Sequence, residues 1–277
     1  MSALEHRTIL VTGITDASSL ALHCARQLQR EGARLVCTGL GPTPHHGALS
    51  ERSTAFLDKT YADFRRTIAD AFGDTALALP LDVTLDASLA DTATALRERG
   101  IRLDGVLHSI AMDKTIRGGE VKPLLAVTRE EFAATMEVSA YSLIALLRAL
   151  LEGGVLNERA AVVALSYLGA ERVVSHPYRN IGVAKAALER IVVELAYELG
   201  RSHGLKVNAV RFSPYTESKA GGAIQGLGEA AERCERESPL GNARAEDLAW
   251  EVAYLLRPYG RVTGEIRHVD GGYHIRA

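Results

Sequence analysis

The stretch TILVTGITDASSLALHCARQLQREGARLVCT, residues 8–38, determines the fold expected for this chain of 277 residues. It opens with a β-branched run at 8–12 that ends at Gly13, a pattern typical of a buried strand followed by a turn. Residues 18–31 then place apolar side chains on one face at helical spacing, and residues 34–38 form a second apolar run. A strand–helix–strand unit of this kind favours a parallel, doubly wound sheet.

The rest of the chain continues this alternation without a linker, an internal repeat or a low-complexity segment. Further strands are predicted at residues 77–83, 103–110, 160–166, 206–211 and 265–269. Further helices are predicted at residues 87–99, 128–151, 177–202 and 245–256. The whole chain, residues 1–277, is therefore expected to be one α/β domain, a Rossmann-like doubly wound parallel sheet flanked by helices.

Residues 41–73 make one connection longer than such a fold needs. A loop at 41–47 precedes a predicted helix at 50–72, in which large apolar side chains recur at helical spacing. We expect this helix to be an insertion packed outside the sheet, and a functional lid is the alternative.

Composition and charge exclude several classes of protein. Hydrophobic residues make up 47% of the chain, which supports a sizeable core, and a net charge of −2 argues against binding to nucleic acid or to a membrane surface. No apolar run is judged long enough to span a bilayer and no signal peptide is recognised, so a cytoplasmic protein is predicted. The cysteines Cys24, Cys37 and Cys234 are expected to be reduced thiols, and no metal is predicted, because no set of His, Cys, Asp and Glu has ligand spacing.

Tyr178 and Lys185 lie seven positions apart at the start of the helix predicted at 177–202. Seven residues make about two helical turns, so the two side chains are expected to face the same way. A phenol beside a fixed cation can hydrogen-bond a developing oxyanion. The pair therefore indicates a site that polarises a carbonyl during hydride transfer, and an ordinary amphipathic helix is the alternative.

Ligands of open parallel sheets bind beyond the carboxyl ends of the strands. After the first strand, Ser18 and Ser19 stand where a helix begins, and its backbone N–H groups can bind phosphate; a plain helix cap is the alternative. After the third strand, Asp82 can accept a hydrogen bond from an adenine amino group while Val83 packs against the ring. A turn aspartate is the alternative there.

Two more strand ends are candidates for cofactor contacts. The segment His108–Ala111 can line a nicotinamide riboside, and the loop Phe212–Thr216 can close over the cofactor, although a packed strand end and a plain loop would look alike. Residues 37–41 offer neither an acid for a ribose 2′-hydroxyl nor an arginine for a 2′-phosphate. The missing arginine favours NADH over NADPH. NADPH is the alternative, because the next loop brings His45 and His46 within reach of the same position.

Together these segments resemble the short-chain dehydrogenase/reductase family, and within it the divergent branch of NADH-dependent enoyl-acyl-carrier-protein reductases. The resemblance rests on the motifs ILVTGI (9–14) with Ser19-Leu20, DGVLHSI (104–110), SAYS (139–142), LSYLGAER (165–172) and GEIRHVDGG (264–272). It covers essentially the whole chain outside about 41–73. The spacing of seven between tyrosine and lysine, in place of four, belongs to this branch.

The resemblance implies the chemistry and its residues. Tyr178 would hydrogen-bond the thioester carbonyl as an enolate forms, Lys185 would hold the nicotinamide ribose, and Tyr167 would line the substrate site. Hydride would pass to the β-carbon of a trans-2-enoyl thioester, which is reduction of the C2=C3 bond in fatty acid biosynthesis. The implied cofactor-binding residues are Gly13, Ser19, Leu20, Leu40, Asp82, Val83, Ser109, Ile110, Ala111, Lys185, Pro214, Tyr215 and Thr216.

The same resemblance implies partners. The substrate would be an acyl thioester, carried on an acyl carrier protein. An acidic carrier would bind a basic patch for which Arg172, Arg211 and Lys219 are candidates, and scattered surface charge is the preferred alternative. A homotetramer is implied, paired through the helices predicted at 128–151 and 177–202.

Departures from the family pattern gather on the substrate side. Tyr167 and Tyr178 are one residue further apart than is usual, and the extra residue lies in the loop 173–177. Ala111 stands where the family commonly has glycine, and Asp113 replaces a small apolar residue next to the substrate. A carboxylate in an apolar site is costly unless it is solvated or paired.

The loop after the sixth predicted strand also departs from the family. Either one residue is missing and Thr216 keeps its place, which we prefer, or Glu217 faces the pyrophosphate. The glycine-rich segment 218–228 fits a substrate lid, and a disordered loop would have the same composition. These departures leave open a reductase of a polar enone or ketone, and a catalytically idle NAD(H)-binding protein is the alternative from another class.

Overall fold

The computed structural model describes residues 3–117, 120–176, 178–222 and 224–276. Its 7-stranded sheet is parallel and has the order β3-β2-β1-β4-β7-β8-β9. The strands are β1 (Thr8–Thr12), β2 (Arg34–Gly39), β3 (Ala76–Pro80), β4 (Leu103–His108), β7 (Leu156–Tyr167), β8 (Lys206–Phe212) and β9 (Ile266–Val269). Every strand predicted from the sequence is in this sheet, so the doubly wound α/β fold is confirmed.

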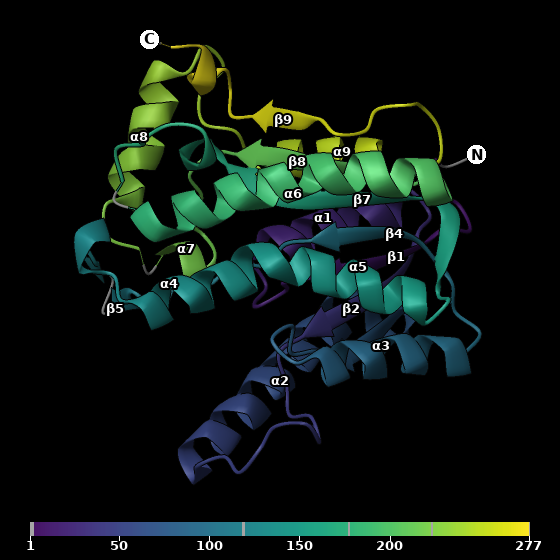
Figure 1. Ribbon diagram of the computed structural model, residues 1–277. Coiled ribbons are helices and arrows are strands. Elements are labelled where there is room, and N and C mark those ends of the chain that lie inside the picture. The colour runs from purple at the N-terminus through teal and green to yellow at the C-terminus, as the bar shows by residue number, and fades with distance from the viewer. Residues whose placement is uncertain (1–2, 118–119, 177, 223, 277) are drawn as a thin grey trace.

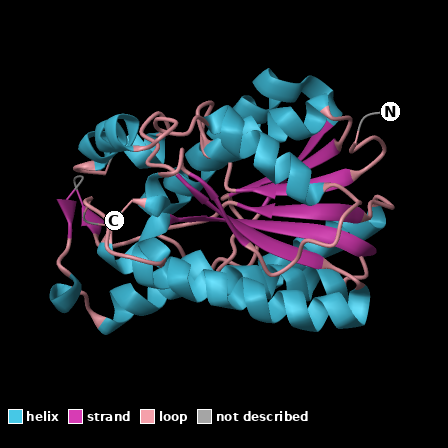
Figure 2. Cartoon of the chain, turned by 90° about the horizontal axis from the view of Figure 1, so that it is seen from above, coloured by secondary structure: helices cyan, strands magenta, loops and turns pink. Residues whose placement is uncertain are grey.

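Helices cover both faces of the sheet (Figures 1 and 2). One face carries α1 (Leu20–Arg30), α2 (Glu51–Phe72) and α9 (Ala245–Leu256), and the other carries α3 (Asp86–Glu98), α5 (Ser142–Glu152) and α6 (Arg179–His203). Neighbouring residues of a strand point to opposite faces. Accordingly Ile9 and Val11 of β1 lie in one core and Leu10 lies in the other, which is why this strand is apolar throughout.

The insertion helix predicted at 50–72 is present as α2, but the expectation that it packs outside the sheet is only half right. Phe64 and Ile68 in its C-terminal half are buried in the core of that face. A Cβ on Gly39, at the end of β2, would lie 2.5 Å from the Phe64 ring, so a glycine there makes room for the helix. The N-terminal half projects from the body of the fold, and Phe56 is 61% exposed.

The helix predicted at 128–151 is divided in three. The helix α4 (Arg129–Met136) begins at a capping box formed by Thr128 and Glu131, and a π-helical turn (Glu137–Tyr141) joins it to α5. In this turn the Ser139 hydroxyl donates to the main-chain carbonyl of Met112 at 3.1 Å and accepts from its N–H at 3.0 Å. The irregular turn therefore ties the helix to the segment that follows β4.

Several short elements were not predicted. They are the hairpin strands β5 (Ile116–Arg117) and β6 (Glu120–Val121), the helices α7 (Lys219–Gly222) and α8 (Leu227–Glu237), and the 3₁₀ turns Gly73–Thr75, Leu124–Ala126, Leu168–Ala170 and Tyr273–Ile275. The segment 218–228, expected to be a lid or loop, thus contains α7 and the start of α8. Residue 223, within it, lies outside the described residues.

One prediction about membranes needs correction. The span Arg129–Glu152 is long and apolar enough to cross a bilayer by length and composition, contrary to the expectation from the sequence. In the fold, 56% of its most apolar window is buried, which is also what a core helix of a globular protein shows. The three cysteines are free and buried, as expected.

Candidate active site

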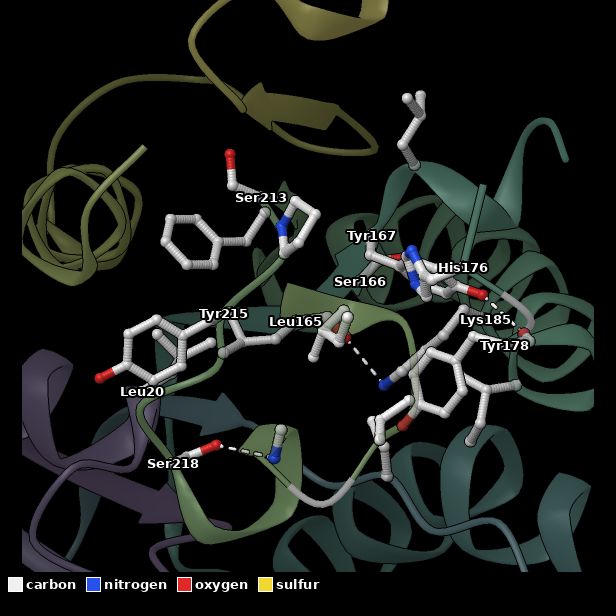
Figure 3. A pocket seen from close by; sticks show the side chains of 18 of the residues that line it. Leu20, Leu165, Ser166, Tyr167, His176, Tyr178, Lys185, Ser213, Tyr215 and Ser218 are labelled. Atoms are coloured by element: carbon white, nitrogen blue, oxygen red, sulfur yellow. Dashed lines mark hydrogen bonds between the residues drawn. The ribbon is translucent and has the colours of Figure 1, made fainter. Parts of the chain in front are cut away.

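The carboxyl ends of β1, β4, β7 and β8 open on a cavity of about 270 Å³, which α6 and α8 help to enclose (Figure 3). This is the edge at which ligands of doubly wound sheets bind. The predicted site residues that line the cavity are Gly13, Ser19, Leu20, Ser109, Ile110, Ala111, Tyr167, Tyr178, Lys185, Pro214 and Tyr215. Most of the residues expected from separate motifs are therefore brought together.

Tyr178 and Lys185 turn towards the same part of this cavity (Figure 3). This arrangement does not arise from helical spacing, which was the reason expected from the sequence. Tyr178 is the N-cap of α6, with φ −90° and ψ 51°, so it stands just before the helix and not within it. Residue 177, where the helix was predicted to begin, lies outside the described residues.

Lys185 is anchored to two strand ends. It is only 5% exposed, and its Nζ donates to the main-chain carbonyls of Ile110 at 3.0 Å and Leu165 at 2.8 Å. Burial lowers the pKa of Lys185 to about 7, because the charged form loses its hydration, and Glu189 partly opposes this shift. The amine is thus fixed where β4 and β7 end.

The phenol of Tyr178 is held in its neutral form. Burial raises the pKa of Tyr178 to about 12, and the negative charge of Asp113 adds to the shift. Tyr167 packs against it with ring centroids 5.5 Å apart, and its hydroxyl donates to the main-chain carbonyl of Tyr178 at 2.9 Å. A neutral phenol is a hydrogen-bond donor, which is the form that stabilises an oxyanion.

Asp113 does not line the cavity, although the sequence placed it next to the substrate. It is 8% exposed, and its Oδ1 accepts from the Thr115 N–H at 2.8 Å and from the Thr135 hydroxyl at 3.4 Å. Asn180, in the first turn of α6, donates to the same Thr135 hydroxyl at 2.9 Å. Asp113 therefore belongs to a buried polar network behind Tyr178 and acts on that phenol through its charge.

The turn after β1 fits a phosphate. Gly13 has φ +81°, and a Cβ there would lie 1.8 Å from the main-chain oxygen of Ser109, so only glycine fits. Ser19 is the N-cap of α1, but among the described residues its hydroxyl makes no capping bond and donates instead to the Asp16 carbonyl at 2.9 Å. The first N–H groups of α1 thus remain available for an anion.

The residues predicted to hold the adenine lie further along the same edge. Leu40 and Asp82 line a hollow together with His46, and Val83 lines a neighbouring one. Asp82 accepts from the N–H and hydroxyl of Thr84 at 2.9 and 2.7 Å and lies 3.1 Å from the His46 Nε2. Although burial opposes it, these hydrogen bonds lower the pKa of Asp82, so the carboxylate is charged.

The loop after β8 joins the cavity to α1. The hydroxyl of Tyr215 donates to the main-chain carbonyl of Ser18 at 2.7 Å, so Tyr215 and Pro214 lie against the start of α1. Thr216 instead lines a separate hollow next to Glu217, which is exposed. The geometry thus brings Tyr215, and not Thr216, to the main cavity.

Some cavity residues were missed. His176 is 4% exposed and packs against two tyrosines, with ring centroids 5.8 Å from Tyr167 and 5.9 Å from Tyr178. The only signal for it was the additional residue in the loop 173–177. Asp270 and Tyr273 also line the cavity, from the far end of the chain, and no spacing pattern connects them to it.

Arg211 is wrong as a candidate for a basic docking patch. It is 8% exposed, and its guanidinium donates to Glu189 at 2.8 and 2.6 Å and contacts Glu171. A buried charge needs a partner, and this pair fills that need. Arg172 is exposed beside Glu171, and the side chain of Lys219 lies outside the described part of the chain.

His268, Asp270 and His274 lie close enough together to hold a metal ion, which the sequence did not suggest. Their hydrogen bonds give another explanation. His274 Nδ1 lies 2.8 Å from Asp270, and Arg211 lies 3.2 Å from the Nε2 of His268. The two imidazole rings are stacked with centroids 3.9 Å apart and planes 17° apart, so their nitrogen lone pairs lie in two nearly parallel planes and do not point at an ion between the rings. The group is therefore best explained as a clasp for the C-terminal segment.

Comparisons with known proteins agree with this geometry. A family model described as enoyl-(acyl carrier protein) reductase matches residues 54–274. Enoyl-acyl-carrier-protein reductase (NADH) FabI of Aquifex aeolicus (strain VF5) is 36% identical over 282 residues, which cover 99% of this chain and 94% of that protein. The Bacillus cereus enoyl-acyl carrier protein reductase, solved with NADP+ and indole naphthyridinone, has a TM-score of 0.85 at 30% identity and covers 100% of both chains. The FabI–NADH complex from Alistipes finegoldii has a TM-score of 0.84 at 27% identity, covering 99% and 90% of the two chains.

Proposed function

This chain belongs to the enoyl-(acyl carrier protein) reductase family, and on that premise we propose how its cavity works. It is an oxidoreductase that uses NADH to reduce the C2=C3 double bond of an enoyl thioester in fatty acid biosynthesis. The family membership therefore favours an active reductase over a catalytically idle NAD(H)-binding protein. The observation that carries the assignment of roles is that Tyr178 and Lys185 line one cavity at the carboxyl edge of the sheet.

The residues around the cavity fit NADH. Gly13 and the open N-terminus of α1 would hold the pyrophosphate, since a side chain at position 13 would collide with Ser109. Ser109, Ile110 and Ala111 would line the nicotinamide riboside, and Leu40, Asp82 and Val83 would hold the adenosine end. When bound, this cofactor supplies the hydride that is added to the β-carbon of the substrate.

Tyr178 would bind the thioester carbonyl oxygen. As the double bond is reduced, negative charge develops on that oxygen, and a neutral buried phenol donates a hydrogen bond to it without prior reorganisation. Lys185 would hold the ribose hydroxyls with the donor capacity that its bonds to Ile110 and Leu165 leave free. An ammonium has three N–H donors, so two bonds to carbonyls are compatible with a third partner.

Tyr167 would act through Tyr178. The hydroxyl of Tyr167 donates to the carbonyl of Tyr178, so Tyr167 would contact the substrate through the face of its ring and not through a hydrogen bond. We therefore assign Tyr167 a positioning role. Asp113 also acts at a distance, since it sets the charge behind the phenol and does not line the cavity.

We also propose that the acyl group of the substrate is delivered on an acyl carrier protein in the cytoplasm. We further propose that the protein itself forms a homotetramer. Large apolar side chains are exposed on the turn before α5 and on α6, among them Tyr141 at 42%, Val183 at 39% and Tyr197 at 65%. Exposed apolar surface of this kind is typical of subunit contacts. Light scattering that finds only monomers at micromolar concentration would refute the tetramer.

The test of the proposed roles is NADH oxidation with trans-2-enoyl thioesters, with the saturated thioester identified by mass spectrometry. Tyr178→Phe removes one donor to the developing oxyanion and should lower kcat by about 10²–10³-fold. NADH binding to this variant, measured by fluorescence titration, should be retained. An unchanged kcat in the variant would remove Tyr178 from the reaction.

A further inference from the structure

The loop between the turn Leu168–Ala170 and α6 carries a buried imidazole that the reaction described above does not use. His176 is 4% exposed and lines the cavity, and its Nε2 is buried without a hydrogen-bond partner among the described residues (Figure 3). A buried polar atom without a partner costs free energy, so such atoms in folded proteins nearly always meet a partner. A bound substrate becomes the partner that completes this one when the ring turns its Nε2 towards the cavity.

The imidazole of His176 is uncharged at physiological pH. Burial lowers the pKa of His176 to about 4, and the nearby Arg179 adds to this shift. A neutral imidazole has one nitrogen that donates and one that accepts. It can therefore bind a hydroxyl group in either tautomer, because a hydroxyl both donates and accepts.

The charges around His176 do not favour a charged ligand. Lys185 is the only lysine or arginine among the described cavity-lining residues, and it already donates to two main-chain carbonyls. Asp113 places a negative charge behind the tyrosines that flank His176. Arg179 lies near His176 with the opposite sign, so neither a carboxylate nor an ammonium on the acyl chain would meet a net charge that favours it, whereas an uncharged oxygen needs none.

Part of the wall near His176 is apolar. Leu168, Val174 and Ile181 line the same cavity, together with the polar Ser175 and the two tyrosines. A buried polar group rejects a ligand that lacks the matching group, because the site is then left unpaired. The ring of His176 lies next to that of Tyr178, so the matching group would stand near the reacting end of the chain.

We propose that His176 is a specificity residue that selects enoyl thioesters whose acyl chain carries an uncharged hydroxyl group close to the double bond. This inference rests on the proposed function, since it concerns the same cavity and the same reduction. It makes the enzyme a reductase of oxygenated acyl chains in preference to plain ones. The extra residue between Tyr167 and Tyr178 is then the change that brings the imidazole into the cavity.

The experiment compares matched substrates. kcat/KM is measured with trans-2-hexenoyl pantetheine and with its counterparts that bear a hydroxyl on carbon 4, 5 or 6. The wild-type enzyme should prefer one of the hydroxylated substrates about tenfold or more. His176→Phe, which keeps an aromatic ring against the two tyrosines, should reduce this preference to about onefold, and His176→Gln, which keeps a hydrogen-bonding group, should retain part of it.

Ser175→Ala is the matched control. Ser175 lines the same cavity from the neighbouring position but is exposed, so its replacement should leave the preference ratio as it is. An equal ratio in wild type and His176→Phe, or in wild type and His176→Gln if the phenylalanine variant does not fold, overturns the proposal for His176. Failure of the wild type to reduce any of the four thioesters while NADH is bound overturns the proposed function itself.

Discussion

The hydroxyl of Tyr167 donates a hydrogen bond of 2.9 Å to the main-chain carbonyl of Tyr178, the N-cap residue just before α6. Two glycines make room for this contact. A Cβ on Gly169 would lie 2.3 Å from the Tyr167 ring, and one on Gly182 would lie 3.2 Å from its hydroxyl. The carbonyl of Tyr178 also accepts from the Gly182 N–H at 3.1 Å. Two hydrogen bonds therefore fix the main chain of Tyr178, and with it the position of the phenol.

Tyr167→Phe should therefore weaken catalysis by misplacing Tyr178. We expect kcat to fall about tenfold, which is less than for Tyr178→Phe, because the donor to the substrate is retained but less well placed. Removing one neutral hydrogen bond should cost about 1 kcal/mol of stability. Steady-state kinetics, together with an NADH affinity that stays constant, checks this role; a variant with wild-type kcat would contradict it.

Asp113→Asn should move the alkaline limb of the pH profile. Burial and the charge of Asp113 both raise the pKa of Tyr178, to about 12, and the neutral phenol is the active form. Removal of the charge lowers that pKa, so kcat/KM should begin to fall at a lower pH than in the wild type. Asp74→Asn, an exposed change before β3, is the control and should leave the profile in place.

How far the sequence predicted this site depends on the kind of signal each residue carries. Gly13 was predictable, because a strand ending at a glycine before a helix is a local pattern. Tyr178 and Lys185 were paired on a helical argument, yet the tyrosine lies outside the helix, and an N-cap conformation has no signature in residue spacing. Arg211 was misjudged because burial depends on which strands and helices become neighbours, and that is a tertiary property.

The helices and strands divide in the same way, into those with a clear local sequence pattern and those without one. Strands such as β1 are apolar on both faces and were found within a few residues, whereas the hairpin β5–β6 has strands of two residues, too short for any periodicity. The π-helical turn Glu137–Tyr141 interrupts a continuous apolar pattern, so the sequence reads as one helix. His176 was missed because a single histidine in a loop has no pattern until the loop is folded.

Lys185→Met should change how stability depends on pH in the protein without cofactor. Burial lowers the pKa of Lys185 from an ordinary 10.5 to about 7. Between these two values the unfolded chain holds a proton that the folded chain has released, so wild-type stability gains from rising pH across that window. The stability of wild type relative to the variant should thus increase from pH 7 towards pH 10, by at most about 1.4 kcal/mol per pH unit.

Urea denaturation at pH 7, 8 and 9 measures this difference, with both proteins in the same buffers. Other groups titrate equally in the two proteins and cancel in the comparison. Parallel stability curves for wild type and Lys185→Met would show that the amine keeps its ordinary pKa in the fold. The variant should also bind NADH more weakly, because Lys185 is proposed to hold the ribose.

Glu189→Gln should destabilise the fold more than any surface charge change. The carboxylate accepts from Arg211 at 2.8 and 2.6 Å and from the Ser166 hydroxyl at 2.6 Å, and the side chains of the ion pair are each only 9% exposed. Neutralising one member leaves a buried guanidinium with less compensation, which costs about 3 kcal/mol.

Lys59→Met is the control, since its ion pair with Asp63 is exposed and worth about 0.5 kcal/mol or less. Urea denaturation of both variants should separate them clearly, and equal midpoints would mean that the buried pair contributes no more than the exposed one. Because Ser166 lines the active-site cavity, Glu189→Gln should also lower kcat, while Lys59→Met should not.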